Sequence, residues 1–268
     1  MKRTRRSFLK FAGASAAAGL CFSPSLSFAS GSPAHGSGPK VAEEADHAER
    51  WAMVIDTTKL NTKEQIEELE KACHAWHNVP HIVDEQGNPT KQEIKWIWGG
   101  HFHQVFTEKH NNFPAEEIEN REFPLLCNHC ENPPCVRVCP TKATFQRPDG
   151  IVAMDYHRCI GCRYCMAGCP FGARSFNFMD PRPYLHEENM DFPTRTRGVV
   201  EKCNFCVDRL AQGLRPICVE KANEMAPGSM FFGDLLKEDS EVRQALREHF
   251  TIRRKPSAGT EPGVYYII

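Results

Sequence analysis

The chain has 268 residues, which is enough for one or two ordinary domains with a sizeable core. Its formal net charge of −1 at pH 7 excludes the strongly basic balance that nucleic-acid-binding proteins usually carry. Its 13 cysteines leave three chemistries open, namely disulfide frameworks, zinc sites and iron–sulfur clusters, and only their spacing can choose among them.

The first 29 residues have the features of an export signal. A twin-arginine pattern, TRRSFLK, occupies residues 4–10, and an apolar run of small residues follows at 11–22. The tripeptide SFA at 27–29 then offers a small-x-small cleavage site, so we expect a twin-arginine signal peptide at 1–29. The alternative is an anchor that stays attached, but the run is well below the length that spans a bilayer. The signal predicts a periplasmic protein that is exported already folded.

Residues 30–48 are rich in Gly, Ser and Pro and are predicted to form a flexible leader. Removing residues 1–29 takes away five basic residues and no acidic one, which leaves 28 basic and 34 acidic residues and a formal charge of about −6. A mildly acidic periplasmic protein is a poor nucleic-acid binder, so we expect no nucleic-acid partner.

An N-terminal segment, residues 49–126, carries the first regular elements. Residues 52–56 (AMVID) form a short β-run, and apolar residues recur at helical spacing over 64–78. Residues 94–98 (IKWIW) alternate as a strand would. The segment therefore predicts two strands that flank one helix.

The clearest motif is the run Cys159-x2-Cys162-x2-Cys165-x3-Cys169, which a proline follows. In bacterial ferredoxins, three cysteines of such a run hold one [4Fe–4S] cluster and the fourth ligates a neighbouring cluster. A tight loop of three thiolates can bind three irons of one cube, and the chain then turns away at the proline. The run therefore predicts iron–sulfur ligation.

A second run of the same kind, Cys127-x2-Cys130-x4-Cys135-x3-Cys139-Pro, lies upstream. Together the two runs predict a two-cluster ferredoxin domain over residues 127–180, in which the fourth ligands are exchanged. The resulting ligand sets are Cys127, Cys130, Cys135 and Cys169 for cluster 1, and Cys159, Cys162, Cys165 and Cys139 for cluster 2.

Zinc and haem are the alternatives to these clusters. Four-cysteine zinc sites also use CxxC pairs, but they need neither three cysteines in CxxCxxC register nor a fourth that precedes proline. Covalent c-type haem needs CxxCH, and no CxxC pair of this chain is followed by histidine. The spacing favours [4Fe–4S] clusters.

A third run, Cys203-x2-Cys206 and then Cys218, lacks a fourth cysteine, and none follows it. Outside the signal segment and the two complete runs, the one remaining cysteine is Cys73, on the predicted helix. Twelve thiols would then hold three [4Fe–4S] clusters, with cluster 3 on Cys203, Cys206, Cys218 and Cys73. The alternative interpretation is that Cys73 is a buried core thiol on the apolar face of its helix.

The C-terminal segment, residues 181–268, contains the third cysteine run and a tail. The tail has a strand-like stretch at 230–234, a helix around 241–250 and a β-rich end at 264–268. We expect an α+β fold of two ferredoxin-like pseudo-repeat modules, with small antiparallel sheets, short helices and many loops. In this fold residues 181–268 pack with 49–126.

The cysteine phrases CNHCENPPCVRVCPTKAT, HRCIGCRYCMAGCPFGARSF and EKCNFCVDR, with the preceding MVID at 53–56, resemble a known family. They are similar to the four-motif ferredoxin-like electron-transfer subunits of dimethyl sulfoxide, polysulfide and formate-dependent nitrite reductases. In that family a first cysteine motif, which also begins with MVID, exchanges its fourth cysteine with the fourth motif. The end of this first motif matches residues 73–80, CHAWHNVP.

The chain departs from the family pattern at both of these motifs. The first three cysteines of motif one are absent, with Leu60 near the first position, and Ala222 stands where motif four would have its last cysteine. In the family these four missing residues would hold one cluster. The resemblance therefore implies that one cluster site is lost whole and that Cys73 belongs to a retained site.

Over nearly the whole predicted mature chain, the sequence also resembles the periplasmic iron–sulfur O subunits of Dsr membrane complexes, which accompany dissimilatory sulfite reductase. That resemblance implies attachment to the inner membrane through partners. The implied partners are an integral-membrane quinone-interacting P-type subunit, a periplasmic multihaem cytochrome c of J type, and the other Dsr membrane-complex subunits.

All-cysteine ligation leaves no open coordination position, so it suits electron relay better than substrate chemistry. The chain has no GxGxxG after a strand, which disfavours a self-sufficient oxidoreductase. We therefore expect a non-enzymatic subunit that relays electrons between the membrane quinone-interacting subunit and periplasmic redox partners. The alternative within this class is an electron-transfer subunit of a molybdopterin reductase or a hydrogenase.

Overall fold

The computed structural model describes residues 47–84, 86–88, 90, 92–108 and 113–268, which lie in one compact unit. The signal predicted at 1–29 and nearly all of the leader predicted at 30–48 lie outside the described residues. Within the described part, none of the helices combines the length and the apolar composition that a membrane crossing needs.

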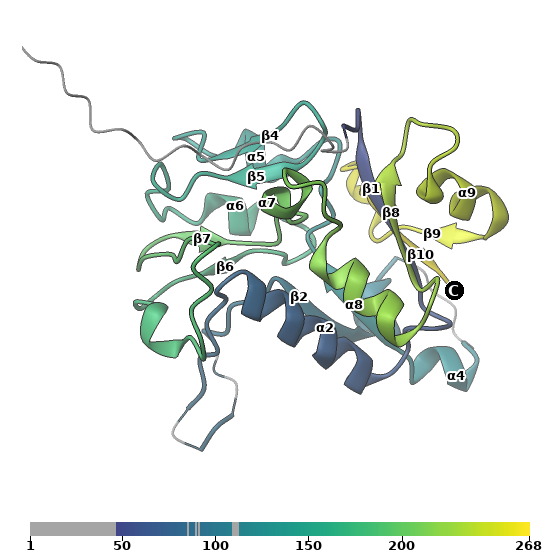
Figure 1. Cartoon of the computed structure of the whole chain (residues 1–268), viewed down its shortest axis with the longest axis horizontal. Coiled ribbons are helices and arrows are strands. Elements are labelled where there is room, and N and C mark those ends of the chain that lie inside the picture. Colours follow the sequence, from purple (N-terminus) through teal and green to yellow (C-terminus); the bar gives the residue numbers. More distant parts are fainter. Residues whose placement is uncertain (1–46, 85, 89, 91, 109–112) are drawn as a thin grey trace, which may run out of the picture. The chain divides into compact units, whose positions relative to one another are not determined.

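A four-stranded sheet joins the two ends of the described chain in the order β8-β1-β10-β9 (Figure 1). Its central strand β1 (Trp51–Asp56) pairs antiparallel with β8 (Met230–Asp234) and parallel with β10 (Val264–Ile267). The edge strand β9 (Thr251–Ile252) pairs antiparallel with β10. The strands predicted at the start and in the tail are confirmed. The expectation of antiparallel sheets is wrong for the β1–β10 pair, which is parallel, an arrangement that the long connection between these strands permits.

Both faces of β1 are buried, which explains its uninterrupted apolar run. Ala52 and Val54 pack against α9 (Glu241–Glu248), whereas Met53 and Ile55 are part of the main core. Alternate side chains of a strand point to opposite faces, so helices and core cover this strand on both sides. The sheet thereby fixes the tail against the N-terminal segment.

The main core lies between this sheet and two helices, α2 (Lys63–Trp76) and α8 (Ile217–Met225), which pack side by side (Figure 1). Thr62 begins α2 with a capping box, in which its side chain accepts from the Gln65 N–H at 3.3 Å. The buried face of α2 carries Ile66, Leu69 and Cys73 at helical spacing. The predicted helix is confirmed, and it directs Cys73 into the core.

Three two-stranded sheets and several very short helices make up the cysteine-rich part. The strand pairs are β2 (Ile97–His101) with β3 (Glu122–Leu126), β4 (Thr144–Gln146) with β5 (Val152–Met154), and β6 (Ser175–Phe176) with β7 (Val200–Glu201). The short helices are α3 (Phe102–Val105), α4 (Glu116–Glu119), α5 (Pro134–Arg137), α6 (Tyr164–Ala167) and α7 (Val207–Leu210), with 3₁₀ turns at Arg182–Tyr184 and Pro256–Ala258.

The expected α+β class is confirmed, but one strand is displaced. The strand predicted at 94–98 begins at Ile97 and continues to His101, because its partner β3 pairs with that stretch from Leu126 to Glu122. Trp96 precedes the strand and is buried in the core, where its Nε1 donates to Glu201 Oε2 at 3.0 Å. The alternating pattern at 94–98 therefore identified buried residues, but not the residues that form hydrogen bonds with the partner strand.

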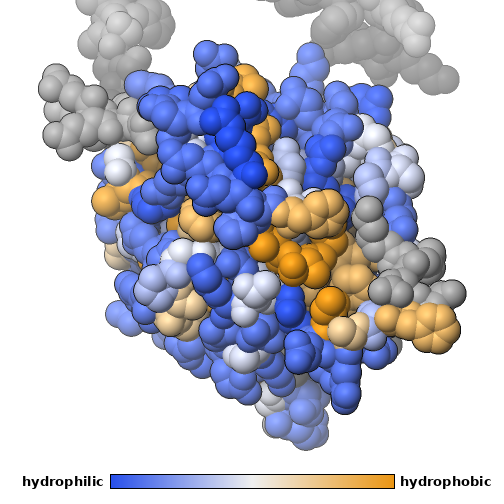
Figure 2. Space-filling view, turned by 90° about the vertical axis from the view of Figure 1, so that its right-hand side faces the viewer, coloured by the Kyte–Doolittle hydropathy of each residue, from blue (hydrophilic) through white to orange (hydrophobic). Residues whose placement is uncertain are grey.

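The face on the right-hand side of Figure 1, where α4, α9 and β9 lie, carries a group of hydrophobic side chains among hydrophilic ones (Figure 2). Phe250, in the link between α9 and β9, is 83% exposed. The cysteines are contributed by other elements, so this surface is not part of the sites that follow.

Candidate iron–sulfur sites

The four cysteines expected to hold cluster 1, here called set 1, line one pocket. Cys127 follows β3, Cys130 lies in the next loop, Cys135 is on α5, and Cys169 follows α6. The structure thus brings together three thiols of one motif and the fourth thiol of the other.

The surroundings of set 1 are poor in water and rich in donors. Burial, together with the neighbouring thiol of Cys127, raises the pKa of Cys130 to about 12. Burial also raises the pKa of Cys169, although backbone N–H groups of Ala173 and Phe171 oppose that shift by bonding its sulfur. Thiolates here need positive charge beside them, which cluster iron would supply.

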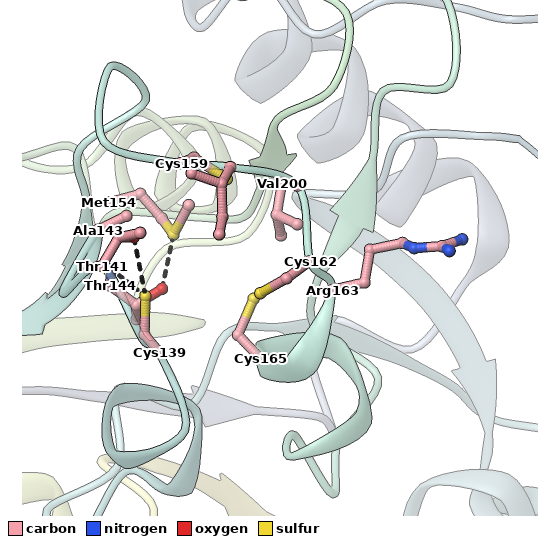
Figure 3. A pocket seen from close by; sticks show the side chains of 12 residues that line it. Cys139, Thr141, Ala143, Thr144, Met154, Cys159, Cys162, Arg163, Cys165 and Val200 are labelled. Carbon is pink, nitrogen blue, oxygen red and sulfur yellow. Dashed lines mark hydrogen bonds between the residues drawn. The ribbon is translucent and has the colours of Figure 1, made fainter. Parts of the chain in front are cut away.

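The four cysteines expected to hold cluster 2, set 2, line a second pocket (Figure 3). Cys139 follows α5, Cys159 and Cys162 precede α6, and Cys165 is on α6. Figure 3 shows the side chain of Arg163 directed away from this space. Set 2 is the more accessible site, because Cys162 is exposed and only Cys165 is buried.

Two backbone features shape the loop of set 2. Gly161 has φ of +70°, and a Cβ there would collide with the carbonyl oxygen of Gly198. On the opposite side, the N–H of Thr144 donates to Cys139 Sγ at 3.4 Å. Burial raises the pKa of Cys139, but the N–H of Thr144 and the hydroxyl of Thr141 lower it more, so the net shift is downward. Such N–H···S bonds are typical of cluster ligands.

The third group, set 3, collects thiols from elements far apart in the sequence. Cys73 comes from α2 and Cys218 from α8, while Cys203 and Cys206 lie between β7 and α7. All four are buried. Cys73 interacts electrostatically with each of the other three, so the structure brings it into their neighbourhood.

Burial is the main influence on the thiols of set 3. It raises the pKa of Cys203 and of Cys218 to about 12. It also raises the pKa values of Cys73 and Cys206, and the neighbouring thiols raise both further. Four thiolates could not share this interior without compensating cations, which is the compensation that a bound iron–sulfur cube provides.

The three sets form a connected series. Cys165 of set 2 interacts electrostatically with Cys135 of set 1. Cys127 of set 1 in turn interacts with Cys203 of set 3. Set 1 is therefore the middle member, with set 2 towards the surface and set 3 in the core.

The thiol arrangement favours cubes over mononuclear metal sites. No group of three or more His, Cys, Asp or Glu side chains in the described residues converges closely enough to hold a single metal ion. Ligands of one zinc ion must all lie about 2.3 Å from it, whereas each thiolate of a cube binds its own iron. Sets 1 and 2 each line a pocket rather than converge on a point, which fits a cube, and a bound cube would supply one-electron redox chemistry.

Sequence reasoning missed several buried residues beside the sets. Arg174 lies between sets 1 and 2, and Arg254 lies near Cys169. His77 Nδ1 lies 3.6 Å from Cys73 Sγ. Arg174 could have been suspected because it follows Cys169 by five residues, but no pattern in the sequence indicates that Arg254, 85 residues beyond Cys169, folds back to it.

The positions of the lost ligands are occupied by core residues. Leu60 and Ala222 are both fully buried and are part of the main core cluster. An apolar interior therefore stands where the family resemblance implies that a fourth site once lay.

Comparisons with known proteins agree with the cysteine pattern. Residues 118–181 match the family described as the 4Fe-4S dicluster domain. The chain is 39% identical to the Hdr-like menaquinol oxidoreductase iron-sulfur subunit 1 of Archaeoglobus fulgidus, and the match covers 98% of this chain and 97% of that protein.

Two further relatives have similar descriptions. The iron-sulfur cluster-binding subunit of menaquinone reductase from Nitratidesulfovibrio vulgaris is 34% identical, over 81% of this chain and 88% of its own length. One of the chains of polysulfide reductase from Wolinella succinogenes is 39% identical, over 61% of this chain and 76% of its own length.

Proposed function

Since this protein belongs to the family of ferredoxin-like iron–sulfur electron-transfer subunits of membrane oxidoreductase complexes, we propose that it relays electrons through three [4Fe–4S] clusters. Like its relatives, it is an electron-transfer subunit of an oxidoreductase complex and not the catalytic subunit. Sets 1, 2 and 3 would hold clusters 1, 2 and 3. The chain's own part is to hold the cubes in series, to exclude water from two of them and to direct N–H groups at their sulfurs.

One observation carries this proposal, namely the continuity of the series. Each pair of successive sets has thiols that interact electrostatically, Cys165 with Cys135 and Cys127 with Cys203. Closely spaced one-electron centres are what a relay requires. The series also has one accessible member, set 2, through which electrons could enter or leave.

The finer assignment is a Dsr-type complex linked to dissimilatory sulfur metabolism. The partners would be an integral-membrane quinone-interacting subunit of P type, a periplasmic multihaem cytochrome c of J type and the other subunits of that complex. The words menaquinol and menaquinone in the descriptions of two relatives support a quinone-linked partner. The twin-arginine pattern at 4–10 supports a periplasmic location.

The alternative is service to a molybdopterin reductase or a hydrogenase. It is favoured by relatives described as parts of reductases, such as the putative dimethyl sulfoxide reductase iron-sulfur subunit of Halobacterium salinarum, which is 47% identical over 66% of this chain. The genes beside this one separate the two assignments. A molybdopterin catalytic subunit encoded there would favour the alternative.

Iron and acid-labile sulfide in the purified chain test the relay itself. Three cubes predict about twelve of each per chain, and two cubes predict about eight. In an intact membrane complex, Cys165→Ser should abolish quinone-linked electron transfer through the series. Unchanged transfer in that variant, with normal assembly, would contradict the relay.

A further inference from the structure

Arg174 is a buried cation for which the described residues offer no acidic partner. It lines the space of set 1, and its Nη1 donates to Thr144 Oγ1 at 3.1 Å and to Met154 Sδ at 3.3 Å, beside set 2. Its guanidinium also interacts with the thiols of Cys135 and Cys165. A buried cation is unfavourable without a compensating anion, and the sulfurs of the two sets are the candidates within reach.

Arg254 is a second buried cation of this kind, near Cys169 of set 1. Its Nε donates to the carbonyl of Val105 at 3.4 Å, and its Nη1 has no hydrogen-bond partner among the described residues. Its guanidinium lies 5.4 Å from the ring centre of Phe171 and interacts electrostatically with Cys169. No carboxylate in the described part of the chain forms an ion pair with it.

The acid that follows Cys130 does not offset these cations. Glu131 is exposed, and it pairs with Arg50 at 3.0 Å. Solvent and the arginine both screen its charge from the interior. Set 1 therefore lies in a net positive environment.

Set 3 has a more acidic environment. Two carboxylates, those of Asp208 and Glu70, each interact with one of its thiols. The carboxylate of Glu220, which interacts with Cys218, is neutralised by its ion pair with Arg209. Arg209 is the nearby guanidinium, but it is paired with Glu220 and contributes little net charge. Lys202, whose Nζ bonds to the carbonyls of Val152 and Cys203, also interacts with the thiol of Cys203. It therefore offsets one of the carboxylates of Asp208 and Glu70 and leaves set 3 with less positive charge than set 1.

We propose that Arg174 and Arg254 raise the reduction potential of the cluster in set 1 above that of the cluster in set 3, so that an electron shared between the two resides mainly on set 1. Reduction adds one negative charge to a cube without breaking a covalent bond, so buried cations favour it and carboxylates oppose it. One electron then passes from the reduced cube of set 3, which is oxidised, to the cube of set 1, which is reduced. This inference rests on the proposed function, because it requires a cube in each set.

The test is an anaerobic redox titration of the purified full chain, followed by electron paramagnetic resonance. Arg254→Gln should lower the equilibrium constant for reduction of one cluster about tenfold, which lowers its midpoint potential by about 59 mV for a one-electron couple. Arg174→Gln should lower that same midpoint together with the midpoint of set 2. Arg174→Lys keeps the charge and should restore most of the potential.

Two further variants test the order of the two midpoint potentials and supply a control. Asp208→Asn removes a carboxylate beside set 3 and should raise a different midpoint, which in the unmodified chain lies below the one that Arg254→Gln moves. Arg158→Gln removes an arginine that is 68% exposed and precedes Cys159 directly, so solvent screening should leave every midpoint in place.

The iron and sulfide contents of the same preparations separate the two levels of failure. A chain that holds no cubes in sets 1 and 3 removes the proposed function together with this inference. If the cubes are present but the midpoint moved by Arg254→Gln lies below that moved by Asp208→Asn, or if neither arginine variant moves a midpoint, only the inference is overturned.

Discussion

Set 2 and set 3 are built in different ways from the same residue type. The thiols of set 2 come from one stretch, residues 139–165, which contains β4, β5 and the start of α6, and Cys162 is exposed. The thiols of set 3 come from α2, α8 and the loop before α7. All four are buried, and three of them, Cys73, Cys203 and Cys218, are part of the main core. One site is local and lies near the surface, whereas the other exists only in the folded chain.

This difference determines what each site can tell us about the fold. A local site can bind its cofactor while distant parts of the chain are perturbed, so its loss should stay local. A site that joins α2 to α8 holds the core together, because a metal that binds only the folded state adds its binding free energy to stability. The following predictions test that distinction.

The largest expected effect is at Cys73. Cys73→Ser should lower iron from about twelve to about eight per chain and destabilise the fold by more than about 3 kcal/mol, because it removes a buried ligand that links two core helices. Cys162→Ser is the matched variant at set 2. It should lower the iron content per chain with little loss of stability. Iron analysis and thermal unfolding at a fixed scan rate measure both. Equal destabilisation by the two variants would contradict the contrast.

A second large effect is expected at Arg195, which supports set 3 indirectly. Arg195 and Glu201 are fully buried, and their Nη2 and Oε2 atoms lie 2.6 Å apart. Arg195 also donates to the carbonyls of His77 and Asn78, immediately after α2. Arg195→Met should cost about 3–5 kcal/mol, because it leaves a buried carboxylate unpaired.

The double variant Arg195→Met with Glu201→Gln is the control for that cost. It removes both charges and should regain part of the lost stability. In the single variant, the spectroscopic signal of the cluster in set 3 should change at a lower temperature than that of the cluster in set 2. A single variant that disturbs set 2 first would show that Arg195 does not act through α2.

Much of this architecture could be predicted from local patterns. The β-run at 52–56, the helix over 64–78 and the tail elements lie close to where the structure has them, because each depends on its own apolar periodicity. The two complete cysteine runs likewise have spacings that define a ferredoxin domain by themselves. The expected exchange of fourth ligands remains a prediction until clusters are observed, but the thiols are grouped as that exchange requires.

Other features could not be read from the sequence because they depend on tertiary pairing. β1 and β10 are more than 200 residues apart in the chain and nothing local specifies that they run parallel. The same holds for Arg254, whose position beside set 1 follows from the tail folding back along β9 and β10. The approach of Cys73 to set 3 is predicted by counting cysteines and by the resemblance of residues 73–80 to the end of the family's first motif.

A moderate, local effect is expected at Gly161 in the loop of set 2. Gly161→Ala should cost about 1–3 kcal/mol of local strain, because φ is +70° and the new Cβ would meet the carbonyl of Gly198. It should lower the occupancy of set 2 and leave set 3 unchanged. Gly172→Ala is the control, since φ is +66° but nothing lies within 4 Å of the new Cβ. Spectroscopy of the individual clusters would report both; an equal loss in the two variants would assign the effect to backbone conformation alone.

The smallest expected effect is a pH dependence carried by α2, on the side of set 3. Burial raises the pKa of Glu70 from 4.5 to about 7, and the carboxylate of Glu93 adds to that rise. Because the folded pKa is the higher one, the stabilisation is complete below pH 4.5 and is lost as the pH rises through about 7. Glu70→Gln should flatten the stability profile between these values, by on the order of 1 kcal/mol. Glu64→Gln, exposed on the same helix, should leave the profile unchanged, and a profile that Glu70→Gln does not alter would mean that this carboxyl is not buried in the loaded protein.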